Sequence, residues 1–199
     1  GNTLSFKYDK CGNLIAKTDK RGNTFTYAYD AMNRLTLETD PLGNSLSYEY
    51  DGNGNLVKKT DKKGNITSYQ YDIENNVIAK TDPKGNAVIF QYDNASNLIT
   101  EIRPDISLTK YVYNAVNQIT EKTVYSSEVR MAKESSEYDQ LGQLVKKIFP
   151  AENYATYIYD NNGNRISVKT FSQDQVMLSE TSFSYWGISG RTTPVPLVT

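Results

Sequence analysis

Aspartates that recur at a fixed spacing are the residues of this chain whose chemistry needs an explanation. One series directly follows a tyrosine, and the aspartates of a second series lie eleven residues after that tyrosine. Repeated carboxylates could bind a hard cation such as calcium, or could act as general acids and bases. A third use is local, because an aspartate side chain can also close a turn of its own backbone.

The repeat that carries these residues has an interval of 21, which lengthens once to 25 after residue 113. Its tyrosines are Tyr8, Tyr29, Tyr50, Tyr71, Tyr92, Tyr113, Tyr138 and Tyr159. The following aspartates are Asp9, Asp30, Asp51, Asp72, Asp93, Asp139 and Asp160, with Asn114 replacing one. The second series is Asp19, Asp40, Asp61 and Asp82. The glycines of both series are Gly12, Gly22, Gly43, Gly54, Gly64, Gly85, Gly142 and Gly163. We predict that these residues define a structural repeat.

The motif D-x-x-G-N favours turn chemistry over ion binding. Aspartate at the start of a turn can accept a hydrogen bond from the backbone two residues on, and glycine or asparagine late in it tolerates a positive φ. Asn33, Asn75 and Asn117 take the place of glycine in the weaker repeats. A calcium loop needs several converging oxygen ligands, whereas each repeat supplies one aspartate. We therefore expect no metal, with ion binding as the alternative.

No catalytic constellation is visible in the sequence. The chain has no histidine, which removes the usual general base and zinc ligand. The aspartates are equivalent to one another, so nothing singles out two of them as an acid–base pair. The motifs G-x-S-x-G and a glycine-rich phosphate loop before a helix are absent. The only cysteine, Cys11, is expected to be a neutral turn residue. We predict a protein that is not an enzyme and holds no cofactor.

The segments between the turns have the pattern of β-strands. Phe25, Tyr27 and Tyr29 alternate with Thr26 and Ala28, which places the large side chains on one face. The partner segments, such as "LIAKT", are short and β-branched. Residues 130–136 could form one helical turn, but we assign them to an irregular hairpin. The sequence predicts an all-β repeat fold of hairpin units that form a long, curved antiparallel ribbon.

Tyrosines of successive repeats are expected to lie one above another in this ribbon. We predict that they form an aromatic ladder, in which each cross-strand pair contributes ~0.2–1 kcal/mol. Contact with a glycan or a protein partner through the same tyrosines is the alternative use.

The period breaks at three places. "RPDIS" at 103–107 and "FPAEN" at 149–153 replace D-x-x-G-N, and Pro104 predicts a turn or bulge because it removes a ladder donor. The final residues, "GISGRTTPVPLVT", have no period. We divide the chain into a repeat region at 1–186, regular at 1–123 and looser at 124–186, and a tail, linker or capping strand at 187–199.

Charge and hydropathy exclude two kinds of partner. Lysine and arginine total 22 against 23 acidic residues, so the chain lacks the basic surface that nucleic acid requires. No apolar run approaches the ~18 residues of a membrane span.

The chain also starts within a repeat, which suggests that it is a piece of a longer protein with any targeting signal upstream.

The units Y-D-x-x-G-x-L and T-D-x-x-G-N-x-x-x-Y-x-Y-D resemble the YD repeats of the Rhs family, over residues 1–186. That family includes bacterial wall-associated proteins, toxin-complex components and teneurins. The resemblance implies a ribbon that spirals into a hollow shell, extracellular or at the cell surface, which encloses a toxin or serves as a scaffold. The family's aspartyl self-cleavage segment has no match in this chain.

Two functions follow from the resemblance as expectations. The first is a structural segment of a β-shell that encloses or presents a toxin or other cargo, with the remainder of a longer repeat chain or copies of itself as partners. The second is an adhesion module that contacts a glycan or protein through its tyrosines. About 16–18 strands at ~4.8 Å give a ribbon of roughly 80 Å, which is too short to close around a passenger of 100 residues.

The turn interpretation predicts that this chain does not depend on calcium. If each aspartate serves only its own turn, addition of EDTA or of calcium should leave the melting temperature unchanged in a thermal scan. A melting temperature that falls by many degrees with EDTA would instead indicate a bound ion that stabilises the folded state.

Overall fold

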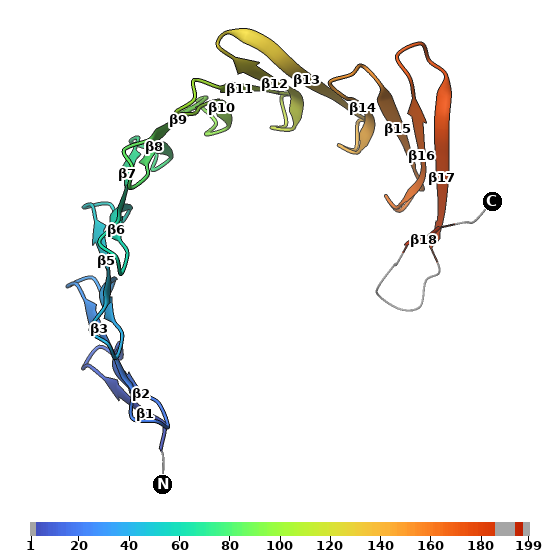
Figure 1. The fold of residues 1–199 in the computed structure, drawn as a ribbon. Helices are drawn as coiled ribbons and strands as arrows, with labels where there is room; N and C mark the ends of the chain where they lie inside the picture. The colour runs from blue at the N-terminus through green and yellow to red at the C-terminus, as the bar shows by residue number, and fades with distance from the viewer. Residues whose placement is uncertain (1–2, 186–193, 197–199) are drawn as a thin grey trace. The chain divides into compact units, whose positions relative to one another are not determined.

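The structure is a computed structural model that describes residues 3–185 and 194–196. It is an all-β protein, in which every described element is a β-strand (Figure 1). The strands divide into two compact units, residues 1–91 and 92–199. The predicted all-β antiparallel repeat fold is confirmed in both.

The first unit is one antiparallel sheet in which each strand pairs with the next one along the chain. Its strands are β1 (Ser5–Tyr8), β2 (Leu14–Thr18), β3 (Thr24–Tyr29), β4 (Leu35–Thr39), β5 (Ser45–Tyr50), β6 (Leu56–Thr60), β7 (Ile66–Tyr71), β8 (Val77–Thr81) and β9 (Ala87–Tyr92).

The second unit repeats this arrangement with two longer hairpins, β12–β13 and β16–β17. Its strands are β10 (Leu98–Ile102), β11 (Leu108–Tyr113), β12 (Ile119–Ser126), β13 (Val129–Tyr138), β14 (Leu144–Ile148), β15 (Tyr154–Tyr159), β16 (Arg165–Phe171), β17 (Met177–Tyr185) and β18 (Pro194–Pro196).

Two kinds of connection alternate along each sheet. Those that begin at the residue after a tyrosine, such as 30–34, will be called Tyr-Asp turns, and those of the second series, such as 40–44, Thr-Asp turns. The Tyr-Asp hairpins contain a β-bulge: Ala28 pairs with Leu37, but Tyr29 pairs with Leu35. The Thr-Asp hairpin of β4 and β5 has a continuous register. Because a bulge increases the local twist, the two edges of each sheet differ in geometry.

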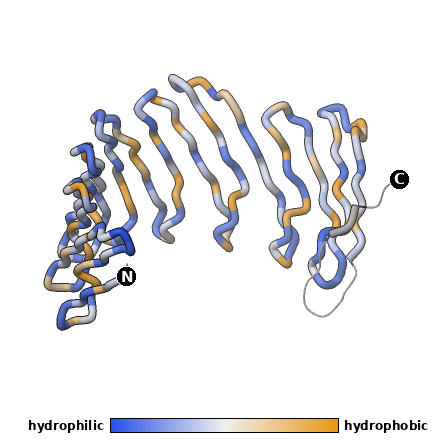
Figure 2. Tube along the Cα trace, turned by 60° about the horizontal axis from the view of Figure 1, so that its bottom comes forward, coloured by the Kyte–Doolittle hydropathy of each residue, from blue (hydrophilic) through white to orange (hydrophobic). Residues whose placement is uncertain are grey.

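The sheets are single layers with almost no core. Ala79, Thr100, Thr123, Ala155 and Ser167 are the residues buried within the described part of the chain, and none has a large side chain. Many large side chains on the faces of the strands are half-buried by their neighbours in adjacent strands, whereas others, such as Phe6 and Met131, are exposed. Figure 2 shows the apolar residues along the strands and hydrophilic residues at most of the turns.

The irregular segments fold as the sequence predicts. Residues 130–136 lie within β13 and are not helical. "RPDIS" and "FPAEN" form turns closed by Arg103 and Phe149, with the same backbone hydrogen bonds as the regular repeats. The predicted tail falls mostly outside the described residues. Only β18 is described there, and it pairs with β17.

The fourth residue of these turns has a positive φ throughout. In the Thr-Asp turn 61–65 this residue is Gly64, with φ of 81° and open space around the position of an added Cβ. In the turn 103–107 it is Ile106, a β-branched residue, with φ of 57°. Strain at this position is therefore a matter of backbone conformation rather than of packing.

Replacement of Gly64 by valine should destabilise the chain by roughly 1–3 kcal/mol, because a β-branched residue strains this conformation. Lys63→Val, one residue earlier in the same turn, is the matched control and should have little effect. Urea unfolding of the two variants measures the difference, and equal destabilisation would show that the turn conformation is not the cause.

The converse change, Ile106→Gly, should stabilise the chain by up to roughly 1–3 kcal/mol, since it removes the same strain from a side chain that is 64% exposed. A loss of stability in the urea experiment would contradict the left-handed conformation of residue 106.

Candidate functional site

Both carboxylate oxygens of each repeated aspartate accept hydrogen bonds within its own turn. In the turn 51–55, the backbone N–H of Asp51 donates to the carbonyl of Asn55 at 3.0 Å, and the N–H of Gly54 donates back to the carbonyl of Asp51 at 3.2 Å. Oδ1 of Asp51 accepts from the backbone N–H groups of Asn53 and Asn55, at 2.9 and 2.8 Å. Its Oδ2 accepts from Nδ2 of Asn55 at 3.0 Å. The carboxylate therefore closes the loop at three points.

These hydrogen bonds favour the ionised carboxylate. The side-chain amide of Asn13 and the backbone N–H of the same residue lower the pKa of Asp9, and the corresponding asparagines do so in Asp19, Asp61 and Asp82. In Asp40 the amino group of Lys62, at 3.0 Å, and the amide of Asn44 lower the pKa to about 2. The resulting stabilisation is present above the unfolded-state pKa and is lost as the pH falls through the folded-state pKa.

The turn geometry leaves these aspartates poorly suited to bind a metal. Both oxygens of each carboxylate of this kind already accept N–H groups from the turn, as in Asp51 and Asp61. Within residues 3–185 and 194–196, no group of three or more potential metal ligands gathers. The carboxylates act as fixed hydrogen-bond acceptors of the backbone.

The repeated tyrosines connect each repeat to the one before it. The hydroxyl of Tyr29 donates to the carbonyl of Leu14 at 3.0 Å, and that of Tyr50 donates to the carbonyl of Leu35 at the same distance. The same bond joins Tyr71 to Leu56, Tyr113 to Leu98, Tyr138 to Ile119, Tyr159 to Leu144 and Tyr185 to Arg165. The acceptor is in each case the residue that begins the strand after the previous Tyr-Asp turn.

Tyr29, Tyr50 and Tyr71 of the predicted aromatic ladder contact the neighbouring repeat through hydroxyl bonds and not through ring stacking. Tyr154 and Phe171 do stack, with centroids 4.8 Å apart, but neither belongs to the predicted series. The repeated tyrosines are linked through their hydroxyl groups instead. Cations also lie over some tyrosine rings: the guanidinium of Arg34 is 4.7 Å from the centroid of Tyr50.

The Tyr-Asp turns are also joined to one another along the edge of the sheet. Nδ2 of Asn13 donates to Oδ1 of Asn33 at 2.8 Å. The pairs Asn55–Asn75 and Asn97–Asn117 make the same bond, at 2.7 and 2.9 Å. The accepting asparagines are those that replace glycine at the positive-φ position, and they recur every 42 residues. Asparagine at this position thus supplies an acceptor that glycine lacks.

A further lateral bond joins Gln118 to the next Tyr-Asp turn, and it depends on asparagine replacing aspartate at position 114. Nδ2 of Asn114 donates to Oε1 of Gln118 at 2.9 Å, which leaves Nε2 of Gln118 to donate to the carbonyl of Gly142 at 2.7 Å. In the next turn, Asp139 accepts from Nε2 of Gln143 at 3.2 Å. Oε1 of Gln143 is then buried without a hydrogen-bond partner beside Gly163.

The structure places the predicted residues in the two rows of turns and at the strand ends beside them, not in one shared site. The sequence did not predict the fifth residue of the turn, such as Asn55, as a partner of the carboxylate. It also missed the backbone carbonyl that each tyrosine binds, and the lateral role of Asn33, Asn75 and Asn117. The regular spacing of these three asparagines, 42 residues, was the sequence pattern that could have indicated their lateral role.

These features define an antiparallel β-repeat protein whose units are joined edge to edge by polar bonds. Residues 8–45, 50–87 and 74–105 match the RHS Repeat family model, so the chain contains RHS repeats. A comparison with curated protein sequences found no match.

Solved structures with this fold include toxin complexes. The chain aligns with the crystal structure of TcdB2-TccC3 with a TM-score of 0.73 and 17% identity, over 94% of this chain and 12% of that one. It aligns with the Photorhabdus luminescens Tc holotoxin pore with a TM-score of 0.71 and 17% identity, over 92% of this chain and 12% of that one. The chain thus spans about a tenth of the length of these proteins, and the likeness concerns the fold. No helix of the described residues could cross a membrane.

Removal of one tyrosine hydroxyl should measure the bond between repeats. Tyr71→Phe deletes a 2.8 Å bond to the carbonyl of Leu56 and should destabilise the chain by about 0.5–1.5 kcal/mol. Tyr69→Phe is the matched control, because its hydroxyl makes no hydrogen bond to the described residues. Chemical unfolding of both variants provides the comparison, and similar values would mean that the hydroxyl of Tyr71 contributes nothing.

Asp139→Asn should stabilise the chain. As in the turn 114–118, the new amide can donate to Oε1 of Gln143, which frees Nε2 to donate to the turn 160–164 and removes a buried unsatisfied acceptor worth roughly 1–3 kcal/mol. The same substitution one repeat later, Asp160→Asn, should destabilise it, because Nδ2 of Asn164 now donates to Oδ2 of Asp160. Thermal unfolding of the pair checks the opposite signs.

Proposed function

We propose that this chain is a non-enzymatic structural segment of a secreted or surface-exposed Rhs protein, where it forms part of the wall of a β-shell that encloses or presents a toxin or other cargo. The observation that carries this proposal is that the repeated side chains make their hydrogen bonds within their own turn or with a neighbouring repeat. The aspartates close their turns, and the tyrosine hydroxyls and turn asparagines join successive units. Such a design suits a continuous sheet rather than a site that exchanges ligands.

The relatives support the same conclusion at the level of architecture. The fold matches parts of Tc toxin chains, and the matched regions are about a tenth of those chains. A wall built from this unit requires a partner along its edges, either the remainder of a longer repeat chain or copies of itself. The strand β1 offers such an edge, with Phe6 48% and Tyr8 57% exposed.

The alternative, adhesion to a glycan through tyrosine rings, has less support. Lys59 and Lys80 lie over the rings of Tyr48 and Tyr69, with Nζ 5.8 and 5.9 Å from the ring centroids. Arg34 covers Tyr50 in the same way. These cations occupy ring faces on which a sugar would have to stack.

The proposal predicts that the 199-residue chain associates through its open edge. Static light scattering should show a mass that rises with concentration, because an unpaired strand with exposed aromatic residues is a template for pairing. Phe6→Lys should reduce this association, since a lysine on an edge strand disfavours edge-to-edge contact, while Lys10→Glu in the nearby turn should not.

A monomer at all concentrations that binds defined glycans on an array would contradict the structural role and favour adhesion. Association that persists unchanged in Phe6→Lys would place the contact elsewhere on the chain.

A further inference from the structure

The hairpin β12–β13 is longer than the strands on either side of it. β12 has 8 residues and β13 has 10, whereas β11 has 6 and β14 has 5. Ser127 and Glu128 form its two-residue turn, and both have a positive φ. The hairpin therefore extends beyond the Thr-Asp edge of the sheet, as the loop between the labels β12 and β13 shows in Figure 1.

This extension leaves one edge of β13 unpaired. β12 is covered by β11 as far as Tyr125, which pairs with Leu108. β13, by contrast, pairs with β14 only from Ser135 to Tyr138. Residues 129–134 pair with β12 on one side, and within the described part of the chain no strand pairs with them on the other. Backbone N–H and C=O groups along this edge are thus available to another strand.

A pocket lies directly beside the open edge. Its volume is about 470 Å³, and it is lined by Arg130, Met131 and Lys133 on β13 and by Ile148, Phe149 and Pro150 where β14 ends. Met131 is 65% exposed although it is apolar. An added strand would continue in the direction of β14, beyond Ile148, and its side chains on the pocket face would meet this apolar lining.

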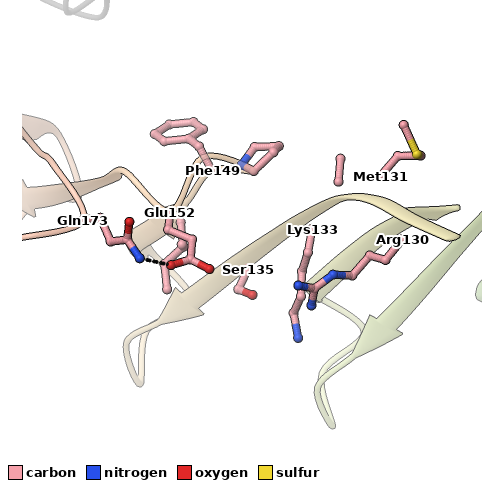
Figure 3. A pocket seen from close by; sticks show the side chains of 10 residues that line it. Arg130, Met131, Lys133, Ser135, Phe149, Glu152 and Gln173 are labelled. Atoms are coloured by element: carbon pink, nitrogen blue, oxygen red, sulfur yellow. Dashed lines mark hydrogen bonds between the residues drawn. The ribbon is translucent and has the colours of Figure 1, made fainter.

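The β13 side of the pocket carries positive charge. Lys133 is paired with Glu121 at 2.7 Å, and the charge of Arg130 also helps to lower the pKa of Glu121, but Arg130 makes no direct ion pair with a described residue. Figure 3 shows the guanidinium of Arg130 beside the side chain of Lys133, and Glu152 on the far side of the pocket held by a hydrogen bond from Gln173. A carboxylate on an added strand would find an unpaired cation at Arg130.

We propose that the outer edge of β13 and the adjoining pocket bind an extended acidic polypeptide segment by β-strand addition. Backbone hydrogen bonds to residues 129–134 provide the affinity, and alternate side chains provide the selectivity, with a carboxylate at Arg130 and an apolar group against Met131 and Phe149. The β-bulge at Arg130 and Met131, which both lie opposite Tyr125, twists the edge, so the pairing is most regular at 132–134.

A second copy of this chain fits the same edge less well. Antiparallel pairing of two such edges over the regular residues 132–134 places each Lys133 opposite the Lys133 of the other copy, and like charges in directly opposed positions are unfavourable. The charge of the edge therefore selects an acidic segment from a different sequence.

The test uses fluorescein-labelled nine-residue peptides and the whole 199-residue chain, with binding measured by fluorescence anisotropy. A peptide of alternating valine and glutamate should bind at least about tenfold more tightly than one of alternating valine and lysine. Arg130→Glu should weaken binding of the glutamate peptide about tenfold, and Lys10→Glu, a charge reversal in a turn of the other unit, should leave it unchanged. Circular dichroism and the melting temperature establish that both variants are folded.

Backbone pairing is tested without any change to the protein. The glutamate peptide with N-methyl groups on alternate residues cannot form the ladder and should lose binding, and the unmodified peptide should slow hydrogen exchange at residues 129–134. Equal binding of the glutamate and lysine peptides, undiminished binding of the N-methylated peptide, or absence of binding would each overturn the proposal. So would a dimer that forms without peptide and is lost in Arg130→Glu, which would assign the edge to a second copy.

Discussion

The constraint on which this structure depends is that a single-layer sheet has no interior. Among the described residues, the buried ones are small, such as Ala155 and Ser167, and no large side chain is fully buried. The hydrophobic effect therefore stabilises each strand only through half-buried contacts with its neighbours. A single defined backbone conformation therefore depends on directional polar contacts, and the turns provide these contacts. An aspartate that accepts three N–H groups fixes the five residues around it without help from a core.

The two edges of the sheet use these turns differently. Tyr-Asp turns carry a bulge, a tyrosine hydroxyl that reaches the previous repeat, and amide bonds between neighbouring turns. Thr-Asp turns share the internal closure, but fewer lateral contacts join them among the described residues, such as that of Lys62 with Asp40. The irregular features of the chain, including the extended β12–β13 hairpin, lie on this less connected edge. The Thr-Asp edge is thus where the repeat tolerates insertion, in keeping with the general tolerance of loops on one face of a repeat array.

Local features of this fold are predictable from the sequence because their causes are local. The strands follow from alternation, and the turns follow from aspartate and a positive-φ residue three positions later, even where Ile106 or Glu152 replaces glycine. The bond from Tyr50 to the carbonyl of Leu35 is different, since it depends on the bulge and on the spacing between strands. At position 114 the sequence shows only that asparagine replaces the repeated aspartate. The orientation of Gln118 in the structure shows that this replacement allows a bond from Gln118 to the carbonyl of Gly142. The open edge of β13 depends on the residue at which β14 ends, and the sequence of β13 itself does not predict that residue.

The direction of the tyrosine bonds gives the sheet a polarity that its antiparallel strands lack. The seven bonds of this kind described above all run from a later repeat to an earlier one, as from Tyr71 to Leu56 and from Tyr159 to Leu144. During synthesis, a newly made repeat therefore finds its acceptor already folded, and assembly can proceed from the N-terminus with contacts to the preceding unit alone. The two ends of such an array are chemically unlike. Each repeat offers a hydroxyl donor to the repeat before it and a carbonyl acceptor to the repeat after it, so that repeats can extend head to tail but have no equivalent match head to head.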